Sequence, residues 1–321
     1  MKKILFETHH LYYLPNFIPI IEALRYRGGY DIYVSMPQYM QERERKLCYG
    51  ACSSMEIQVI NADLEATRIE EIKSANFDVI VVGGGPGGSS AAAFAAMAGH
   101  RVLLLEKAVY PRDKTCGDAV GGSAMRIVTE LGVRPMIEKT PLFRVDSIIF
   151  SGPGKNTTVK IDLPADQVED RTAGYSLPRL QFDYMMFKRA TELVLENKGA
   201  IIQDFAVNKI HIKEEGDEQQ ITGISGVIGG NRSGNTPLTF HAPLTVGAGG
   251  FNCPVAKTIT EICHNEPMRD NEHYIAAYRE YWEMEHEGDI GSIEIHFLGG
   301  KLANGYFWIF PVSKNIANVG C

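Results

Sequence analysis

The chain has 321 residues, of which 45% are hydrophobic and 22% charged, and these proportions exclude a disordered or fibrous protein. Its 32 Lys and Arg residues against 39 Asp and Glu residues leave a formal net charge of −7. Such an acidic chain is a poor candidate for non-specific nucleic-acid binding, which depends on neutralising phosphates, so we expect no nucleic-acid partner. Six scattered cysteines without a Cys-x-x-Cys pair argue against a disulfide framework or a zinc ribbon, and we assign no metal.

The first 75 residues predict half of an open α/β sheet. Short apolar strands are expected at 3–6, 31–34 and 57–60, with a helix at 17–24 that ends at Gly28-Gly29. The longest apolar stretch, Ala91–Ala98, is too short and too rich in alanine to span a bilayer. No signal peptide is evident after Lys2–Lys3, and the cysteine usage fits a reducing compartment, so we expect a cytoplasmic protein.

A second β-α-β unit follows directly. Residues 77–82 form a continuous apolar run, typical of a strand buried on both faces of a parallel sheet. Gly83–Gly88 comes next, then a small-residue helix at 89–98 and a strand at 101–105 that ends in Glu106. Alternating strands are expected within 144–161 and 206–240, and an amphipathic helix at 182–196 lies between them. The pattern is that of an α/β nucleotide-binding domain followed by a second sheet.

The motif Gly83-x-Gly85-x-x-Gly88 is the strongest sign of chemistry in the chain, because a buried strand precedes it and a helix follows it. Gly83 allows the tight turn, Gly85 lets the backbone approach a pyrophosphate, and Gly88 lets the helix pack close to the strand. Glu106 lies 23 residues beyond Gly83, where a carboxylate that binds ribose is expected. The alternative is a glycine turn that binds nothing, and the motif alone does not distinguish FAD from NAD.

The residues after Glu106-Lys107 resemble a known family. Tyr110-Pro111-Arg112-Asp113-Lys114-Thr115-Cys116-Gly117-Asp118 is similar to the Pro-Arg-x-Lys-x-Cys-Gly-Asp stretch of the geranylgeranyl reductase family of FAD-dependent oxidoreductases. Arg179-x-x-Phe182-Asp183 looks like an element of the wider aromatic-hydroxylase-like flavoproteins, and 246–256 resembles the strand and turn that return to their flavin domain. Residues 293–297 and Tyr306-x-Trp308-x-Phe310-Pro311 look like the reductase family's substrate-domain signature. The resemblance covers about residues 76–321.

This resemblance implies a fold and a set of domains. The fold class is α/β, or α+β overall: a Rossmann-like FAD-binding domain with a mixed or antiparallel substrate-domain sheet, preceded by an extra β-α-β segment. We expect the extension at 1–75 and the FAD-binding core at 76–150, with return segments near 176–210 and 241–260. The substrate-domain sheet would take 151–175, 211–240 and 261–321.

The resemblance also implies a reaction and its partners. Family members reduce isolated carbon–carbon double bonds of isoprenoid chains, with hydride leaving flavin N5. The expected substrate is an isoprenoid lipid, a quinone side chain or a prenyl diphosphate, and NAD(P)H or another reductant would be the electron donor. A lipid substrate permits peripheral membrane contact at most. The expected cofactor-binding residues are Gly83, Gly85, Pro86, Gly87, Gly88, Glu106, Lys107, Arg112, Cys116, Gly117, Asp118, Arg179, Val207 and Gly249.

Two further assignments keep an alternative open. By analogy, Cys116 lies near the flavin and delivers the proton, whereas the structural alternative is a buried small hydrophobic residue. Tyr306, Trp308 and Phe310 alternate at period two, so they would line one face of a strand. That face would wall a tunnel for a polyprenyl chain, or it would simply belong to a core strand.

Two segments depart from the reductase pattern. Residues 1–75 precede the usual start of such an enzyme and resemble the N-terminal half of glycosyltransferase-like or glycerophosphotransferase-like proteins, so a fusion or an artefactual join is expected. The chain stops at Gly320-Cys321, which we interpret as a C-terminal truncation. These departures leave open a truncated fusion that folds but binds no flavin. A second rival function is a flavin monooxygenase or halogenase on a similar scaffold, against which the Tyr306-x-Trp308-x-Phe310-Pro311 segment argues.

Overall fold

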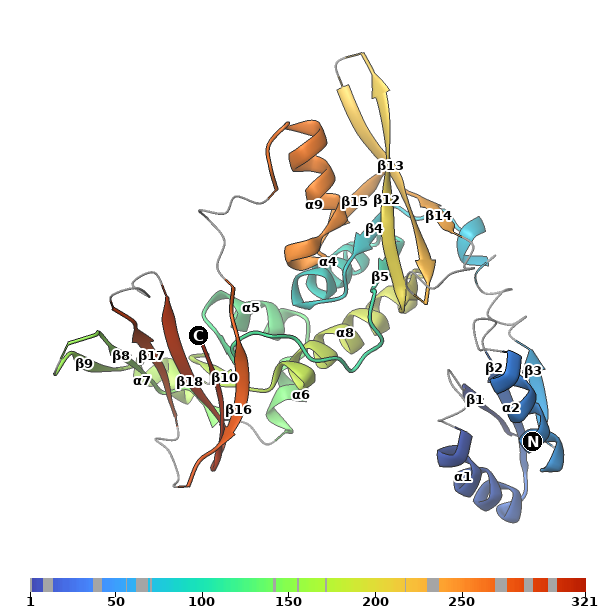
Figure 1. Cartoon of the computed structure of the whole chain (residues 1–321), viewed down its shortest axis with the longest axis horizontal. Coiled ribbons are helices and arrows are strands. Elements are labelled where there is room, and N and C mark those ends of the chain that lie inside the picture. The colour runs from blue at the N-terminus through green and yellow to red at the C-terminus, as the bar shows by residue number, and fades with distance from the viewer. Residues whose placement is uncertain are drawn as a thin grey trace. The chain divides into compact units, whose positions relative to one another are not determined.

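The structure is a computed structural model that describes residues 2–7, 14–36, 42–55, 57–61, 69, 71–140, 143–154, 156–170, 172–216, 218–229, 237–268, 276–285, 291–299 and 305–321. The chain divides into two compact units (Figure 1). The first comprises Met1–Ala75 with Asn231–Leu238, and the second comprises Asn76–Gly230 with Thr239–Cys321. Each unit has a hydrophobic cluster of its own.

The first unit contains a three-stranded parallel sheet in the order β1-β2-β3, formed by β1 (Lys2–Glu7), β2 (Tyr30–Met36) and β3 (Gln58–Asn61). Helices α1 (Leu14–Arg27) and α2 (Glu42–Ser54) connect the strands. Helix α1 ends at Gly28, whose φ of 68° suits a glycine and whose N–H donates to the Leu24 carbonyl at 3.1 Å. The core members are Leu14, Ile21, Val34, Cys48, Cys52 and Ile57.

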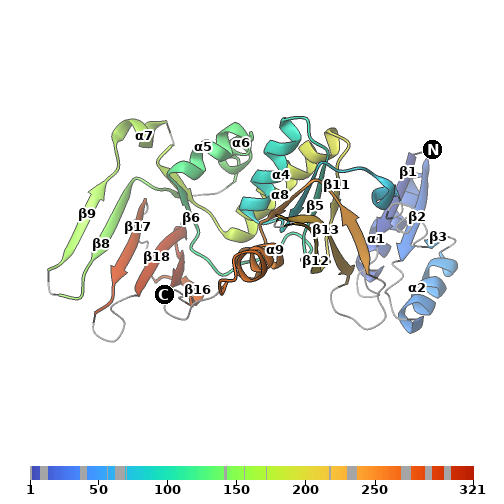
Figure 2. The same cartoon turned by 90° about the horizontal axis from the view of Figure 1, so that it is seen from above.

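The second unit is centred on a four-stranded parallel sheet in the order β11-β5-β4-β15. Its strands are β4 (Val79–Val82), β5 (Val102–Leu105), β11 (Ala200–Ile202) and β15 (Leu244–Gly247). Every residue of β4 and β5 is buried, as their continuous apolar sequences predict. Helices α4 (Pro86–Met97) and α8 (Arg179–Glu196) contact each other on one side of this sheet (Figure 2). The expected Rossmann-like arrangement is therefore confirmed.

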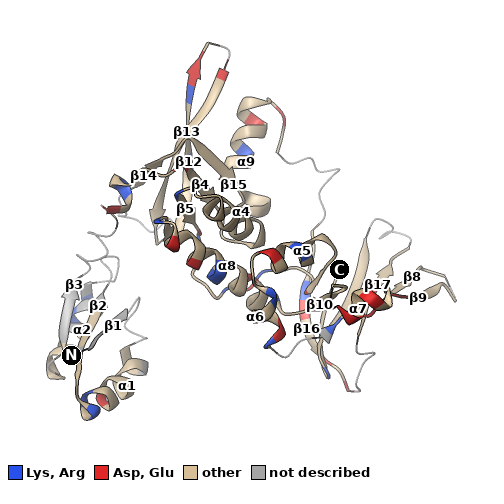
Figure 3. Ribbon diagram, turned by 180° about the vertical axis from the view of Figure 1, so that it is seen from behind, with Lys and Arg blue, Asp and Glu red and all other residues tan. Residues whose placement is uncertain are grey.

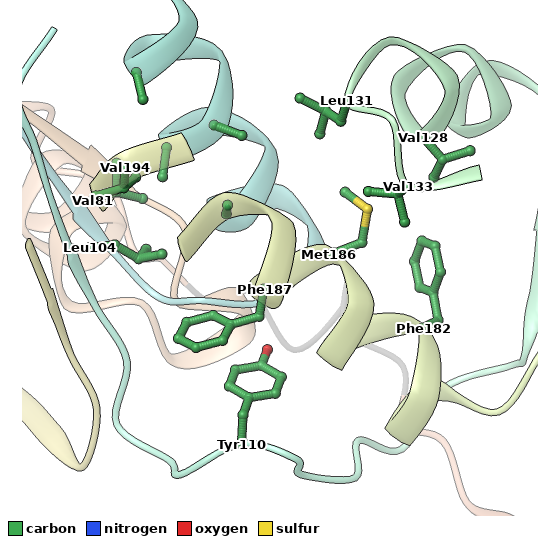
Figure 4. Packing of buried hydrophobic residues seen from close by; sticks show 14 of the residues in the cluster. Val81, Leu104, Tyr110, Val128, Leu131, Val133, Phe182, Met186, Phe187 and Val194 are labelled. Atoms are coloured by element: carbon green, nitrogen blue, oxygen red, sulfur yellow. The ribbon is translucent and has the colours of Figure 1, made fainter. Parts of the chain in front are cut away.

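The main core forms where α4 and α8 meet the sheet. Small residues of α4, including Ala92, Ala93 and Ala96, are buried there and let the two helices approach closely. Figure 4 shows larger side chains from the sheet, from α8 and from the segment around α5 (Ser123–Glu130) in the same cluster. The ring of Tyr110 stacks on Phe187 with centroids 4.2 Å apart, which ties the loop after β5 to α8.

The described residues of this unit form three further sheets. Strands β6 (Ala119–Gly121), β10 (Gly174–Ser176) and β7 (Phe143–Arg144) form a small antiparallel sheet, with α6 (Arg134–Glu138) nearby in the sequence. Strands β12 (Phe205–Glu215), β13 (Glu218–Ile228) and β14 (Leu238–His241) form the second. This second sheet reaches β15 through β13 and lies across from α4 and α8 (Figure 2). Helix α9 (Pro254–Thr258) follows β15.

The third is a six-stranded sheet in the order β16-β19-β18-β17-β8-β9. Its pairs are antiparallel except for β17 with β8, which run parallel, so the expected mixed sheet is confirmed. The strands are β8 (Ser147–Ser151), β9 (Thr158–Asp162), β16 (Arg279–Glu283), β17 (Ser292–Phe297), β18 (Tyr306–Ser313) and β19 (Ile316–Gly320), and α7 (Ala165–Glu169) follows β9.

The sheets differ from the sequence expectation at two places. Residues 147–150 were expected in the FAD-binding core, but they belong to β8 of the six-stranded sheet. Residues 211–240 were expected in the substrate-domain sheet, but β12, β13 and β14 pair with one another and not with the six-stranded sheet. The long β12–β13 hairpin closes locally, so its hydrogen bonds are satisfied without the distant strands. The expected domain boundaries remain a prediction. Among the described residues, no helix is both long and apolar enough to cross a membrane.

Candidate cofactor site

A cavity of about 860 Å³ opens at the carboxyl ends of the parallel strands, where Val82, Leu105 and Gly247 end β4, β5 and β15. Ligands of open α/β sheets bind at this end of the strands. The lining residues are Val82, Gly83, Gly85, Pro86, Gly87, Leu105, Glu106, Lys107, Arg112, Asp113, Lys114, Phe205, Ala206, Val207, Val246, Gly247, Ala248, Gly249, Gly250, Phe251, Asn252, Cys253, Pro254 and Ala256.

The glycines of the Gly83–Gly88 turn have two different roles. Gly83 has a φ of 108°, and a Cβ there would lie 2.4 Å from the carbonyl oxygen of Ala248. A Cβ on Gly88 would lie 1.7 Å from the carbonyl oxygen of Gly83, so the helix can pack only with glycine at this position. A Cβ on Gly87 would meet nothing within 4 Å, and one on Gly85 would meet only Arg112. Gly83 and Gly88 therefore close the turn, whereas Gly85 and Gly87 leave backbone accessible to the cavity.

The N-terminus of α4 faces the same space. Gly85 is the N-cap and makes no side-chain capping bond, and Pro86 occupies the first turn. Gly85, Pro86 and Gly87 all line the cavity, so the first-turn amides and the positive end of the helix dipole are directed at it. Lys107, Arg112 and Lys114 add three cationic side chains to the wall. This end of the cavity suits a diphosphate.

Glu106 is buried, with 5% of its surface exposed, at the end of β5. Its Oε2 accepts the N–H of Gly84 at 2.6 Å, and its Oε1 accepts the N–H of Ala108 at 2.8 Å. These bonds fix the carboxylate on the glycine turn while it still lines the cavity. Each oxygen keeps a further lone pair, so the group can also accept hydrogen bonds from ribose hydroxyls.

A buried ion-pair network lies beside the cavity. Helix α8 carries charges of both signs (Figure 3), and Arg179 and Asp183 are its buried members. The Asp183 carboxylate accepts Arg179 Nε at 2.7 Å and an Arg112 guanidinium nitrogen at 2.7 Å. Burial alone would lower the pKa of Arg179, but the bond and charge of Asp183 raise it, so this guanidinium stays charged. Asp183 thus links α8 to the loop that carries Arg112.

Asp118 lies at the far end of that loop and is completely buried. Its Oδ1 accepts the N–H of Arg179 at 3.1 Å, and its Oδ2 accepts the hydroxyl of Tyr281 at 2.8 Å. Burial raises the pKa of Asp118, and the hydrogen bonds from Tyr281, Asn318 and the Arg179 amide partly oppose this shift. Asn318 also donates to the Cys116 carbonyl at 3.3 Å. Strands β16 and β19 therefore hold the 116–118 turn from residues 163 and 202 positions away in sequence.

The aromatic strand β18 meets the same turn. A Cβ on Gly117 would lie 2.5 Å from the ring of Phe310, so the ring packs directly on this glycine. Trp308 donates its Nε1 hydrogen to Asn318 at 2.7 Å, and its ring covers Gly320. Ring centroids lie 5.9 Å apart for Tyr306 and Trp308 and 6.3 Å apart for Trp308 and Phe310. The expected alternation along one strand face is present, and the role of these rings in substrate binding remains a prediction.

The cavity gathers most, but not all, of the residues expected to bind the cofactor. The expected residues that line it are Gly83, Gly85, Pro86, Gly87, Glu106, Lys107, Arg112, Val207 and Gly249. Gly88, Gly117, Asp118, Cys116 and Arg179 are not among the lining residues, and all but Cys116 hold the turn and the loop in place. Cys116 itself is exposed, so the alternative of a buried small hydrophobic residue is wrong.

Sequence reasoning missed several lining residues. Asp113 and Lys114 lie inside the Pro-Arg-x-Lys stretch that resembles the reductase family. Because the adjacent Arg112 was expected to bind the cofactor, the same reasoning could have included these two residues. Phe251, Asn252 and Cys253 come from the 246–256 segment, of which only Gly249 was singled out. Among the described residues, no cluster of three or more His, Cys, Asp or Glu side chains could hold a metal ion.

The wall of the cavity fits FAD. Its volume lies within the roughly 300–1,000 Å³ of small-molecule sites. Open glycine backbone, a helix N-terminus and three cations suit the diphosphate, and Glu106 suits a ribose. Leu105, Phe205 and Val207 supply apolar surface for an aromatic ring system.

Comparison with known protein families decides the assignment. The pattern described as an FAD binding domain matches residues 76–276. The chain belongs to the FAD binding domain family. It is a flavoprotein of the FAD-dependent oxidoreductases, and its matched region carries the glycine turn, Glu106 and the whole 107–118 loop. The first unit lies almost entirely outside the match.

The curated relatives of this flavoprotein include two kinds of reductase. It is 28% identical over 247 residues to a menaquinone reductase of Mycobacterium tuberculosis, which covers 76% of this chain and 54% of the relative. It is 29% identical over 246 residues to digeranylgeranylglycerophospholipid reductase 1 of Methanopyrus kandleri, covering 76% of this chain and 57% of the relative. The chain therefore spans about half the length of the curated relatives it matches.

A solved structure shares the fold of the second unit. The myxobacterial chondrochloren halogenase, an FAD-dependent halogenase, aligns with a TM-score of 0.60 at 22% identity. The alignment covers 76% of this chain and 52% of the halogenase chain. At this identity the similarity establishes the fold alone.

Proposed function

We propose that this chain is an FAD-dependent reductase of isoprenoid carbon–carbon double bonds. The observation that carries the proposal is the 107–118 loop, which lines the cofactor cavity at one end and packs under β18 at the other. A single segment thus connects the cofactor to the sheet that carries Trp308 and Phe310. The names of the menaquinone and digeranylgeranylglycerophospholipid reductases support an isoprenoid-bearing substrate.

The cofactor side of the proposal assigns three tasks. The amides of Gly85 and Gly87 would bind the FAD diphosphate, with Lys107 and Lys114 balancing its charge. Glu106 would accept hydrogen bonds from the adenosine ribose. When bound and reduced, FAD supplies a hydride at N5, the chemistry that saturating a double bond requires.

The substrate side would use the face of the six-stranded sheet that carries the aromatic side chains of β18. Residues paired across neighbouring strands point to the same face. The register pairs Trp308 with Ile295, Ile295 with Phe150 and Phe150 with Val159, and it pairs Tyr306 with Phe297. Phe297, Tyr306 and Val159 are 52%, 48% and 56% exposed. Ile161, two residues from Val159 and 48% exposed, shares the face. An apolar face that continues from Phe310 to the surface suits a long isoprenoid chain.

Cys116 would deliver the proton to the carbon next to the one that receives hydride. Its thiol belongs to the turn held by Asn318 and Tyr281, and its exposure leaves it accessible to a bound chain. NAD(P)H or a small electron carrier would regenerate reduced cofactor. The proposal also includes peripheral membrane contact, which the lipid substrate class supports. It includes a transferase-like ancestry of residues 1–75, which the sequence resemblance supports.

The test is a reduction assay on the purified chain loaded with FAD. Under anaerobic conditions with dithionite, a phospholipid bearing geranylgeranyl chains should gain two hydrogens per reduced double bond, measured by mass spectrometry. A phospholipid with fully saturated chains of the same length is the control. A parallel aerobic assay with NADPH and chloride tests the rival functions. An oxygen-dependent gain of hydroxyl or halogen there, with no hydrogenation in the anaerobic assay, would instead identify a monooxygenase or halogenase.

The role of Cys116 has a matched control in Cys263, which is also an exposed free cysteine. Cys116→Ala should retain FAD and lower the reduction rate by about 100-fold or more, as loss of a general acid does. Cys263→Ala should keep the full rate. If Cys116→Ala keeps the full reduction rate, as Cys263→Ala should, Cys116 is excluded as the proton donor.

A further inference from the structure

Asp113 introduces a negative charge into the wall of a cavity that otherwise suits an anion. It lies between Arg112 and Lys114, and all three line the cavity. The Asp113 side chain is 51% exposed and pairs with a cation as a carboxylate. Arg112 is already paired with Asp183, which leaves less of its charge for the cofactor. An uncompensated Asp113 would repel the diphosphate of FAD.

Arg279 of β16 provides the compensation. Its terminal nitrogen donates to both carboxylate oxygens of Asp113 at 2.7 Å and to the carbonyl of Lys114 at 3.0 Å. Only 6% of the Arg279 side chain is exposed, and its guanidinium lies 4.6 Å from the ring centroid of Tyr281. Burial opposes the charged form, yet the bond to Asp113 raises the pKa of Arg279, so it stays a cation. The hydrogen bonds to Asp113 and Lys114 and the contact with the Tyr281 ring together restrict where this guanidinium can lie.

The same contact orients Lys114. Arg279 holds the Lys114 carbonyl from the sheet side, while the Lys114 side chain lines the cavity near Gly250. Arg279 lies beyond residue 276, where the match to the FAD binding domain ends. The group that completes the charge balance of the cavity is therefore supplied by the six-stranded sheet.

We propose that Arg279 is a positioning residue for FAD: it neutralises Asp113 and holds the Lys114 backbone so that the cavity presents a net positive wall to the diphosphate. This inference rests on the proposed cofactor site. Part of the affinity for FAD then depends on β16, a strand whose residues do not line the cavity.

The test is a double-mutant cycle on the full chain, with the dissociation constant of FAD measured by quenching of flavin fluorescence. Arg279→Gln should weaken FAD binding by about tenfold, because it frees the charge of Asp113 within reach of the diphosphate. Asp113→Asn alone should bind FAD as tightly as wild type or more tightly. In the double variant Arg279→Gln/Asp113→Asn, affinity should return to within about threefold of wild type.

Ionic strength separates the charge effect from general loosening of the loop. Screening at about 0.5 M salt shortens the range of the Asp113 charge, so the deficit of Arg279→Gln should shrink there. Arg279→Lys keeps the charge and should stay within about threefold of wild type. Arg126→Gln removes an exposed arginine paired with Glu130 and should change nothing.

The outcomes distinguish the inference from the site on which it rests. A double variant as weak as Arg279→Gln, with a deficit insensitive to salt, would overturn the role of Arg279 and leave the cofactor site intact. If Arg279→Gln does not fold, Arg279→Lys and Asp113→Asn still decide the matter: weaker FAD binding by Asp113→Asn contradicts the charge argument. Failure of wild type to bind FAD would overturn both.

Discussion

The parallel sheet and the six-stranded sheet both act on the 107–118 loop, but by different means. The parallel sheet shapes the cavity mainly with residues from Val82 to Glu106, joined by Val246–Ala248 at the end of β15, and its key contacts at Gly83 and Gly88 are steric. The six-stranded sheet reaches the loop from Arg279, Tyr281 and Asn318, mainly through hydrogen bonds. The first sheet therefore decides whether a cavity exists, and the second decides how its loop is placed.

The largest effect is expected where the parallel sheet leaves no space. Gly88→Ala would bring a Cβ to 1.7 Å from the Gly83 carbonyl oxygen, so the turn must open. We expect a loss of about 3 kcal/mol or more in the free energy of unfolding and no bound FAD. Thermal denaturation and the visible flavin spectrum measure both. Gly87→Ala, on the same helix with open space around it, should keep or raise stability. A Gly88→Ala variant as stable as Gly87→Ala would refute the steric account.

The next effect concerns the ion pairs between α8 and the loop. Asp183→Asn would leave the buried Arg179 and the partly buried Arg112 without their carboxylate. We expect a loss of about 3–5 kcal/mol, measured by urea denaturation, as for other broken buried pairs. Glu192→Gln, which breaks an exposed pair on the same helix, should cost less than about 1 kcal/mol. Similar losses for the two variants would mean that the buried network does not stabilise the fold.

A smaller effect is expected where β18 packs on the loop. Gly117→Ala would place a Cβ 2.5 Å from the edge of the Phe310 ring. Because a ring can shift, we expect a cost of about 1–3 kcal/mol in unfolding free energy. The same substitution should cost less in a Phe310→Leu background, since the shorter side chain makes room. An undiminished cost in that background would show that Phe310 does not cause the strain.

The smallest effect is the pH dependence contributed by Asp118. Burial raises its pKa in the folded protein above the ordinary value. A carboxyl with a raised folded pKa binds its proton more tightly in the folded state, so its stabilising contribution is complete at low pH. That contribution is lost as pH rises from the ordinary Asp range through the raised pKa. As pH rises across this window, the unfolding free energy of wild type should therefore fall relative to that of Asp118→Asn. No change in that difference with pH would argue that the Asp118 pKa is not raised.

The same contrast explains which parts of the molecule the sequence could predict. The buried strand, the Gly83–Gly88 turn and Glu106 were predictable, because each follows from a pattern within about 25 residues. The period-two aromatic residues of β18 predicted a strand, but not that Phe310 covers Gly117. The partnership of Arg279 with Asp113 joins residues 166 positions apart. Such contacts depend on strand order and register, which local patterns do not encode.

Strand β9 has a consequence for how the protein behaves at high concentration. It lies at the border of the six-stranded sheet, with all five of its residues exposed. Among the described residues no strand pairs with its outer edge, and such an edge strand with Val159 and Ile161 on one face can pair with another chain, which is how many proteins begin to aggregate. Lys160 and Asp162 point to the opposite face of this strand. A neighbouring copy that added itself here would have to accommodate both charges, so the apolar face can stay open to solvent without nucleating fibrous assembly.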